Sequence, residues 1–170
     1  SVLMTNPVSD LLRGGTQPTH GVPYMHPRAG TYSDPRIAGG GQIYAQLCHA
    51  AAYLSFLTGA RAQEVFARFH NDGTVLDIYD CLALRMDDTS IVTLASTGAT
   101  SLERRDFEVR VFGTQGALFL DLWQGKLEFV PLDGPHRVYP DLAPEDVYPH
   151  QAPARNLIDS IRDPGCNLSP

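Results

Sequence analysis

Apolar residues recur at helical spacing in one segment of the chain, directly after the glycines at positions 39–41. They follow one another at steps of four, three, four and three, and they are Ile43, Leu47, Ala50, Leu54 and Leu57. At about 100° per residue these positions form one stripe, which predicts an amphipathic helix over residues 41–58. Gly59 follows at the position where a left-handed glycine commonly ends a helix.

The period of the pattern changes to two from about residue 61 onward, which is typical of β-strands. Asn71-Asp72-Gly73 forms a favoured hairpin turn between the first two runs. The predicted strands cover about 61–70, 75–85, 91–97, 107–112, 117–123 and 127–130. Short turns without intervening helices favour antiparallel pairing. The pattern therefore predicts an α+β fold: an open, predominantly antiparallel sheet of about six strands, with helices packed on one face.

The two ends of the chain are rich in glycine and proline. The first 40 residues predict a loop, apart from a strand end and a helical turn around residues 2–12. The segment 131–149 carries five prolines and is also predicted to be loop. A last helix is expected over 153–162, where Leu157, Ile158 and Ile161 have helical spacing and Asp163-Pro164-Gly165 follows. We expect residues 1–170 to form a single domain and to be part of a longer protein.

Composition narrows the function classes. A length of 170 residues is that of one soluble domain, and the net charge of −6 argues against non-specific nucleic-acid binding. No apolar run reaches the roughly 20 residues needed to span a bilayer, and no signal-peptide pattern is present, which favours a cytoplasmic protein. The three cysteines are widely spaced and fit no metal, redox or disulfide pattern, and they are Cys48, Cys81 and Cys166.

The predicted sheet carries apolar side chains on both faces. Neighbouring strands contain Val109, Val111, Phe119 and Leu122, which point to opposite sides. Two helices cannot cover both faces of such a sheet. We therefore expect a partner domain or a second subunit on the open face, in a homodimer or homotetramer.

A second stripe runs along the predicted helix beside the apolar one. It consists of Gln42, Gln46, His49 and Tyr53, at spacings of four, three and four. An exposed polar helix face is one interpretation. A pocket lining is the other, because the stripe has no charged residue and begins at glycine amides that can accept an anion or a close ligand.

Several motifs occur together in an order that resembles the second domain of the glucose-fructose oxidoreductase and inositol dehydrogenase (Gfo/Idh/MocA) family. The resemblance covers nearly everything from about residue 32 to the C-terminus. The motifs are Tyr32-Ser33-Asp34-Pro35, Gly39-Gly40-Gly41 with His49 eight residues later, Phe56-Leu57-Thr58-Gly59, Glu64-Val65, Asp77-Ile78-Tyr79-Asp80, Gly113-Thr114-Gln115-Gly116-Ala117-Leu118, and Asn156-Leu157-Ile158-Asp159-Ser160-Ile161-Arg162.

The resemblance implies an NAD(P)-dependent oxidoreductase acting on a sugar, polyol or related hydroxyl compound. NAD or NADP would be bound mainly by an N-terminal Rossmann domain, whose glycine loop and Glu-Lys-Pro segment this sequence lacks. His49 matches the family's general acid/base, which suits an imidazole because its pKa lies near operating pH. The substrate-binding candidates are Gln42, Gln46 and Tyr53 on the helix, with Tyr24 and Arg28 in the early loop. No metal site is expected, since the other histidines lack ligand spacing with one another.

One departure from the family pattern leaves the function open. Family dehydrogenases usually carry an aspartate four residues before the histidine, and that position is Ala45 here. The chain is therefore interpreted as part of an oxidoreductase, with a non-catalytic sugar-binding regulator of the same fold as the alternative. A hydrolase that oxidises its substrate transiently is a third hypothesis. The chain by itself is expected to be inactive.

Overall fold

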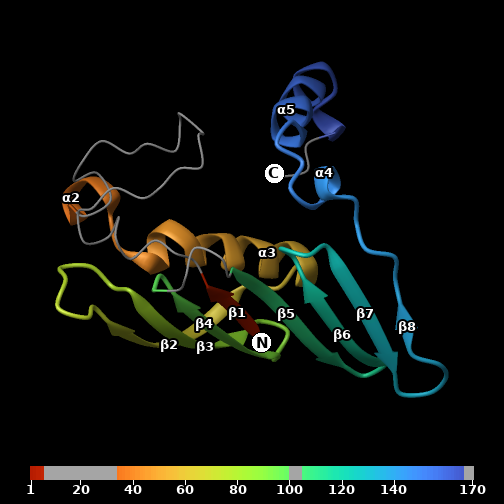
Figure 1. Cartoon of the computed structure of the whole chain (residues 1–170), viewed down its shortest axis with the longest axis horizontal. Helices are drawn as coiled ribbons and strands as arrows, with labels where there is room; N and C mark the ends of the chain where they lie inside the picture. The colour runs from red at the N-terminus through yellow and green to blue at the C-terminus, as the bar shows by residue number, and fades with distance from the viewer. Residues whose placement is uncertain (6–33, 100–104, 167–170) are drawn as a thin grey trace.

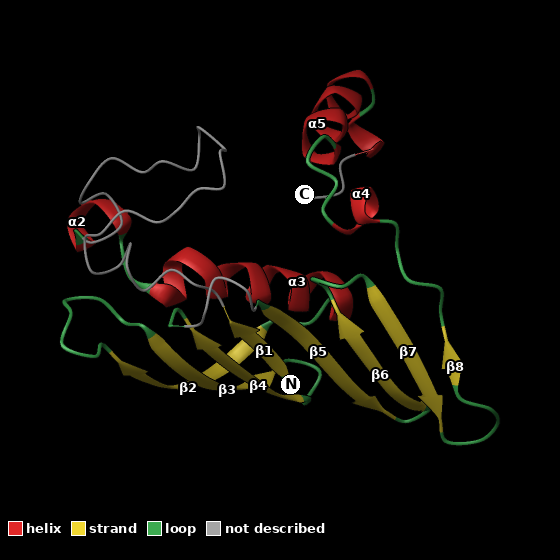
Figure 2. Cartoon of the chain, viewed as in Figure 1, coloured by secondary structure: helices red, strands yellow, loops and turns green. Residues whose placement is uncertain are grey.

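The computed structural model describes residues 1–5, 34–99 and 105–166 of the chain. Within them, one sheet carries helices on one face only (Figures 1 and 2). The strand order is β2-β3-β4-β1-β5-β6-β7-β8. Its strands are β1 (Val2–Thr5), β2 (Ala62–His70), β3 (Tyr79–Met86), β4 (Ile91–Thr97), β5 (Asp106–Gly113), β6 (Gly116–Asp121), β7 (Lys126–Pro131) and β8 (Arg137–Val138).

The predicted α+β class and open sheet are confirmed, but the predicted number of strands is wrong. The described sheet has eight strands rather than six. The two additional strands are β1, which was expected only as a strand end, and β8, whose two paired residues are too few to give a pattern. All neighbours are antiparallel except β1 and β4, which are parallel. β1 enters the middle of the sheet, where Val2 and Met4 are buried.

The predicted helix over 41–58 is present, but it begins in an unexpected form. Its first part is η2 (Ile43–Leu47), a π-helical turn in which the N–H of Cys48 donates to the carbonyl of Ile43. α3 (Cys48–Thr58) continues it and ends at Gly59, whose φ of 68° is left-handed as predicted. In Figure 1 this helix lies across one face of the sheet.

The core lies between α3 and the sheet. The buried apolar residues are Val2, Met4, Leu47, Ala50, Leu54, Ala60, Leu82, Leu84, Met86, Val92, Leu94 and Val109. The strand residues among them alternate with exposed ones, because successive side chains point to opposite faces. The middle of the sheet is thus closed by the helix on one side.

The expected strand over 75–85 begins later, at Tyr79. The turn before it is confirmed: the N–H of Thr74 donates to the carbonyl of Asn71 at 2.9 Å, and Gly73 has a φ of 76°. After the turn, however, Leu76 and Ile78 are buried in a separate small cluster with Ala99. Residues 75–78 therefore form an irregular segment that places Leu76 and Ile78 in this cluster, and regular pairing with β2 begins at Tyr79.

The C-terminal part is less compact. The predicted loop over 131–149 contains β8 and a short helix, α4 (Pro144–Val147). The expected last helix is α5 (Ala152–Arg162), followed by a single 3₁₀ turn, η3 (Pro164–Cys166). α5 buries none of its residues, and Figure 1 shows it held away from the sheet.

The face of the sheet opposite α3 carries no described helix (Figure 2). Large apolar side chains on this open face are exposed, among them Phe66 on β2, Ile91 on β4 and Phe112 on β5. Phe112 contacts Phe119 edge-on, with ring centroids 6.0 Å apart. The described residues leave this face uncovered, as the sequence pattern predicts.

Candidate functional site

The start of the helix that carries His49 is fixed by one residue from another part of the chain. Asp77 accepts hydrogen bonds from three successive backbone amides: Gly41 to Oδ1 at 3.0 Å, Gln42 to the main-chain carbonyl at 2.9 Å, and Ile43 to Oδ2 at 2.7 Å. The first N–H groups of a helix have no partner within the helix, and here Asp77 supplies it. These amides are therefore not free to bind an anion, which the sequence interpretation had allowed.

Two of the three glycines before the helix, Gly39 and Gly41, are required by two different features of the backbone. Gly39 ends the short helix α2 (Pro35–Ala38) with a left-handed φ of 80°. Gly41 lies against Asp77, so closely that a Cβ atom would come within 2.3 Å of the Asp77 carbonyl oxygen. The glycine segment therefore allows backbone to meet backbone at the start of the helix.

Gln42 belongs to the core rather than to a surface pocket. It is fully buried, and its Nε2 donates to Ser96 Oγ on β4 at 2.8 Å. Its Oε1 is also buried and has no hydrogen-bond partner among the described residues. Asp80 is paired with Ser96 across β3 and β4, so its side chain lies on the same face of the sheet.

Asp80 on β3 is a buried acidic residue that the sequence analysis did not propose for the site. It is 4% exposed, and no donor within the described part of the chain reaches its carboxyl oxygens, whereas its neutral form can hydrogen-bond to Asp77. Burial and, after it, the charge of nearby Asp77 raise the pKa of Asp80 to about 8. The charge of a carboxylate without donors would be costly here, so Asp80 keeps its proton near neutral pH.

His49 lies on the outer side of α3 and is exposed. Gln46 precedes it by three residues and is half-buried, so these two side chains are neighbours on the accessible surface of the helix. Ala45, four residues before His49, offers no carboxylate. The imidazole of His49 is thus accessible on the surface of the helix.

Tyr53 lies at the boundary between the buried and the exposed faces of the helix. Its ring contacts Phe107 of β5, with centroids 5.9 Å apart, and burial raises the pKa of its hydroxyl. It is half-buried and so reaches the margin of the helix rather than its exposed side.

The π-helical turn explains why the four polar residues do not form one surface stripe. A π-helix closes its hydrogen bonds over five residues rather than four, so the residues after it lag behind the α-helical register. In the structure His49 is exposed, Gln46 and Tyr53 are half-buried, and Gln42 is fully buried. No periodicity in the sequence indicates this turn.

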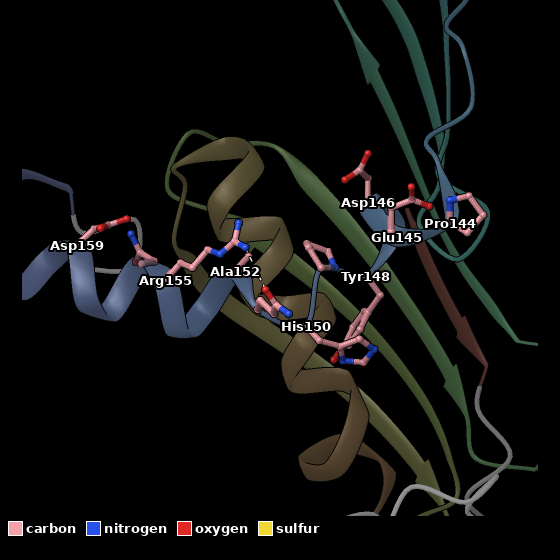
Figure 3. A pocket seen from close by; sticks show the side chains of 11 residues that line it. Pro144, Glu145, Asp146, Tyr148, His150, Ala152, Arg155 and Asp159 are labelled. Atoms are coloured by element: carbon pink, nitrogen blue, oxygen red, sulfur yellow. Dashed lines mark hydrogen bonds between the residues drawn. The ribbon is translucent and has the colours of Figure 1, made fainter.

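The described residues also form an open hollow between α4 and α5, of about 710 Å³ (Figure 3). It is lined by exposed charged and aromatic side chains, including Tyr148, His150 and Arg155, and Arg155 donates to Gln151 at 3.0 Å. None of the predicted site residues lines it. Its polar groups are solvent-exposed, so it has no buried, preorganised donor or acceptor that would select a ligand.

The other predictions from the sequence concern the early loop, metal binding and the cysteines. Tyr24 and Arg28 lie outside the described residues. Among the residues that are described, no group of three or more His, Cys, Asp or Glu side chains could hold a metal ion. No helix in the same ranges is long and apolar enough to cross a membrane. The three cysteines are free and exposed.

The comparisons with known proteins identify what the chain is similar to. A family model described as the GFO/IDH/MocA C-terminal domain matches residues 16–119. A search of curated proteins finds no match.

Solved structures of oxidoreductases share the fold. UDP-N-acetylglucosamine 3-dehydrogenase from Acidithiobacillus ferrooxidans matches with a TM-score of 0.64 at 11% identity, over 95% of this chain and 43% of that one. Levoglucosan dehydrogenase in complex with NADH and L-sorbose matches with a TM-score of 0.62 at 14% identity, over 81% and 38%. An oxidoreductase from Sinorhizobium meliloti matches with a TM-score of 0.56 at 19% identity, over 81% and 33%. The chain spans less than half the length of each of these structures.

Proposed function

We propose that this chain, which belongs to the GFO/IDH/MocA family as a C-terminal domain, forms the substrate side of an NAD(P)-dependent oxidoreductase that acts on a hydroxyl group of a sugar, polyol or related compound. The observation that carries the proposal is the placement of His49. It is exposed on a helix whose start is anchored to the sheet, and a half-buried glutamine lies one turn before it. Relatives of the same fold include dehydrogenases of sugar-type compounds.

In this proposal His49 accepts the proton of the substrate hydroxyl as that group becomes a carbonyl, and returns it in the reverse direction. Gln46 donates or accepts a hydrogen bond that orients the substrate, since an amide offers both functions. Tyr53 would contact the substrate only at the margin of the helix, and Gln42 supports the helix from the core.

The described residues do not fit a dinucleotide. The family's cofactor needs free backbone amides at a helix N-terminus for its diphosphate. The amides of Gly41, Gln42 and Ile43 are all taken by Asp77. NAD or NADP would therefore be held by another part of the protein, and this chain alone would bind it weakly or not at all.

The test is turnover by the full-length protein with NAD and NADP across a panel of sugars and polyols. His49→Ala should lower kcat by roughly 10²-fold or more, the usual contribution of a general acid/base. His136→Ala is the matched control, because that exposed histidine pairs with Glu128 at the far edge of the sheet, at 3.4 Å. Equal activity of both variants would overturn the role of His49.

A non-catalytic regulator remains the second candidate function, and Ala45 is the observation that favours it. Without the carboxylate one turn earlier, His49 lacks the partner that usually supports it as a base. Sugar binding to the full-length protein, measured by calorimetry, together with no turnover on any substrate, would establish the regulator.

We also propose that the open face of the sheet is covered by a second copy of the chain. Phe66, Ile91 and Phe112 are 63%, 70% and 72% exposed on that face, an apolar area that soluble monomers rarely leave open. Light scattering of the protein should give at least a dimer, and Ile91→Asp with Phe112→Asp should dissociate it. A monodisperse species of 18.6 kDa for this chain would contradict the proposal.

A further inference from the structure

Asp77 alone provides the acceptors for three backbone amides at the start of the helix that carries His49. Both carboxyl oxygens and the main-chain carbonyl are used, each by a different amide. A carboxylate that receives two N–H donors is a strong, charge-assisted partner, about twice as strong as a neutral one. Asp77 also comes from a segment 34–36 residues away in sequence, so it ties the helix to a distant part of the fold.

The segment that carries Asp77 cannot easily move. Its two neighbours, Leu76 and Ile78, are 4% and 0% exposed. The backbone of Ile78 is held on both sides: its N–H donates to the His70 carbonyl at 2.9 Å, and its carbonyl accepts from Gly98 at 2.8 Å. Asp77 is thus a fixed point to which the helix is attached.

The contact between Asp77 and Gly41 is also close on the side of the helix. A Cβ atom on Gly41 would meet the Asp77 carbonyl oxygen at 2.3 Å and its nitrogen at 2.8 Å, so the two backbones are already in contact. Immediately after this contact comes the π-helical turn at Ile43–Leu47, and His49 follows two residues later. The π turn interrupts the regular α-helix between this contact and His49, so the direction of His49 depends on how the start of the helix is held.

We infer that Asp77 is a positioning residue: it holds the Gly41–Ile43 backbone so that the π turn presents Gln46 and His49 to the substrate. The inference rests on the proposed function, since it acts through His49. In this inference Asp77 acts through the helix and not on a reacting atom, because both of its carboxyl oxygens accept backbone amides.

The test compares kcat and KM of the full-length protein with those of Asp77→Ala and Asp77→Asn. Asp77→Ala removes both side-chain acceptors and should lower kcat at least about tenfold, because a displacement of about 1 Å in a catalytic group can cost up to 10²-fold. KM should rise by a smaller factor than kcat falls, because the same turn presents Gln46 while binding groups outside the helix keep their places. Asp77→Asn keeps one acceptor oxygen and should recover part of the loss.

A matched control separates positioning from a loss of folded protein. Val92→Ala removes core volume from β4 without touching the helix start, and it serves as a variant destabilised to a similar degree. Each variant is assayed at a temperature where circular dichroism shows it fully folded. A drop in kcat for Asp77→Ala but not for Val92→Ala supports the inference.

The outcomes also distinguish this inference from the proposed function. If His49→Ala abolishes turnover while folded Asp77→Ala keeps the kcat of Val92→Ala, Asp77 is only a structural cap and the inference is overturned. If His49→Ala keeps full turnover, the proposed function fails first. If Asp77→Asn is as inactive as Asp77→Ala, the one acceptor oxygen that Asp77→Asn keeps does not help to hold the start of the helix. The inference that each carboxyl oxygen contributes to positioning is then wrong.

Discussion

The helices α3 and α5 are both 11 residues long, but they differ in how much of their surface is buried. α3 lies on the sheet and buries Ala50 and Leu54, whereas α5 buries nothing. Yet α5 has the cleaner amphipathic pattern, with Leu157, Ile158 and Ile161 on one side. Amphipathicity shows which face of a helix needs a cover, but it does not say whether the same chain provides that cover.

The difference extends to the polar groups around the two helices. The start of η2, which α3 continues, is held by the part-buried Asp77 and by the buried pair Gln42 and Ser96. Around α5 the polar contacts are exposed, such as Arg155 to Gln151 and Arg162 to Asp159. Buried contacts resist solvent competition and exposed ones contribute little, so α3 should be the more stable of the two.

The largest effect is expected from removing core volume under α3. Leu54→Ala should lower the free energy of unfolding by roughly 3 kcal/mol, because it leaves a cavity between helix and sheet. Leu157→Ala on α5 should cost less than about 0.5 kcal/mol, since that side chain is 64% exposed. Urea unfolding followed by circular dichroism measures both. Equal losses would mean that α5 is as well packed as α3.

The next effect concerns the buried acid beneath η2. The folded pKa of Asp80, about 8, lies above its ordinary value of 3.8, so the folded state binds this proton more tightly. Stability should therefore be full below about pH 4, fall as the pH rises towards 8, and level off above that.

Asp80→Asn should remove this fall, which amounts to about 2 kcal/mol between pH 5.5 and 7.5. Asp159→Asn is the counterpart on α5, where the carboxylate is exposed, and it serves as the control. The free energy of unfolding of each variant, measured by urea titration across this range, checks the difference. A wild-type protein whose stability is flat from pH 5 to 8 would show that Asp80 is ionised in the fold.

A smaller effect is expected from single hydrogen bonds. Ser96→Ala should cost about 1–2 kcal/mol, because it leaves the fully buried Gln42 amide without its acceptor. Ser160→Ala on α5 removes a bond from Oγ to the Asn156 carbonyl at 2.7 Å, but water can replace it, so a few tenths of a kcal/mol are expected. The melting temperatures of the two variants give the ranking, and the reverse order would contradict it.

The same contrast shows what the sequence could predict. The α3 helix, its glycine stop and the turn at Gly73 follow local rules of periodicity and turn geometry, and the structure confirms them. β1 was expected only in part, because its place between β4 and β5 depends on pairing with residues about 90–100 positions away.

The candidate site was less predictable because it depends on two non-local features. Asp77 falls within the strand predicted over 75–85, whereas in the structure its neighbours Leu76 and Ile78 are buried and Asp77 faces the start of the helix. The stripe of four polar residues assumed uniform α-helical rotation, which the π turn interrupts. Gln42 in the core and His49 on the surface are the result.

The smallest effect is expected at the end of α5. Ile161 is 75% exposed, so Ile161→Ser should change the free energy of unfolding by less than about 0.5 kcal/mol. Native-state hydrogen exchange of the wild type gives the companion measurement: amides of α5 should exchange through local opening, while those of α3 should open only with the sheet. The two helices would then be different cooperative units. A different result would be that α5 amides are protected as strongly as those of α3 and that Ile161→Ser removes this protection. The apolar stripe of α5 would then be covered by another part of the protein or by a second molecule. The two helices would differ in what covers them and not in their stability.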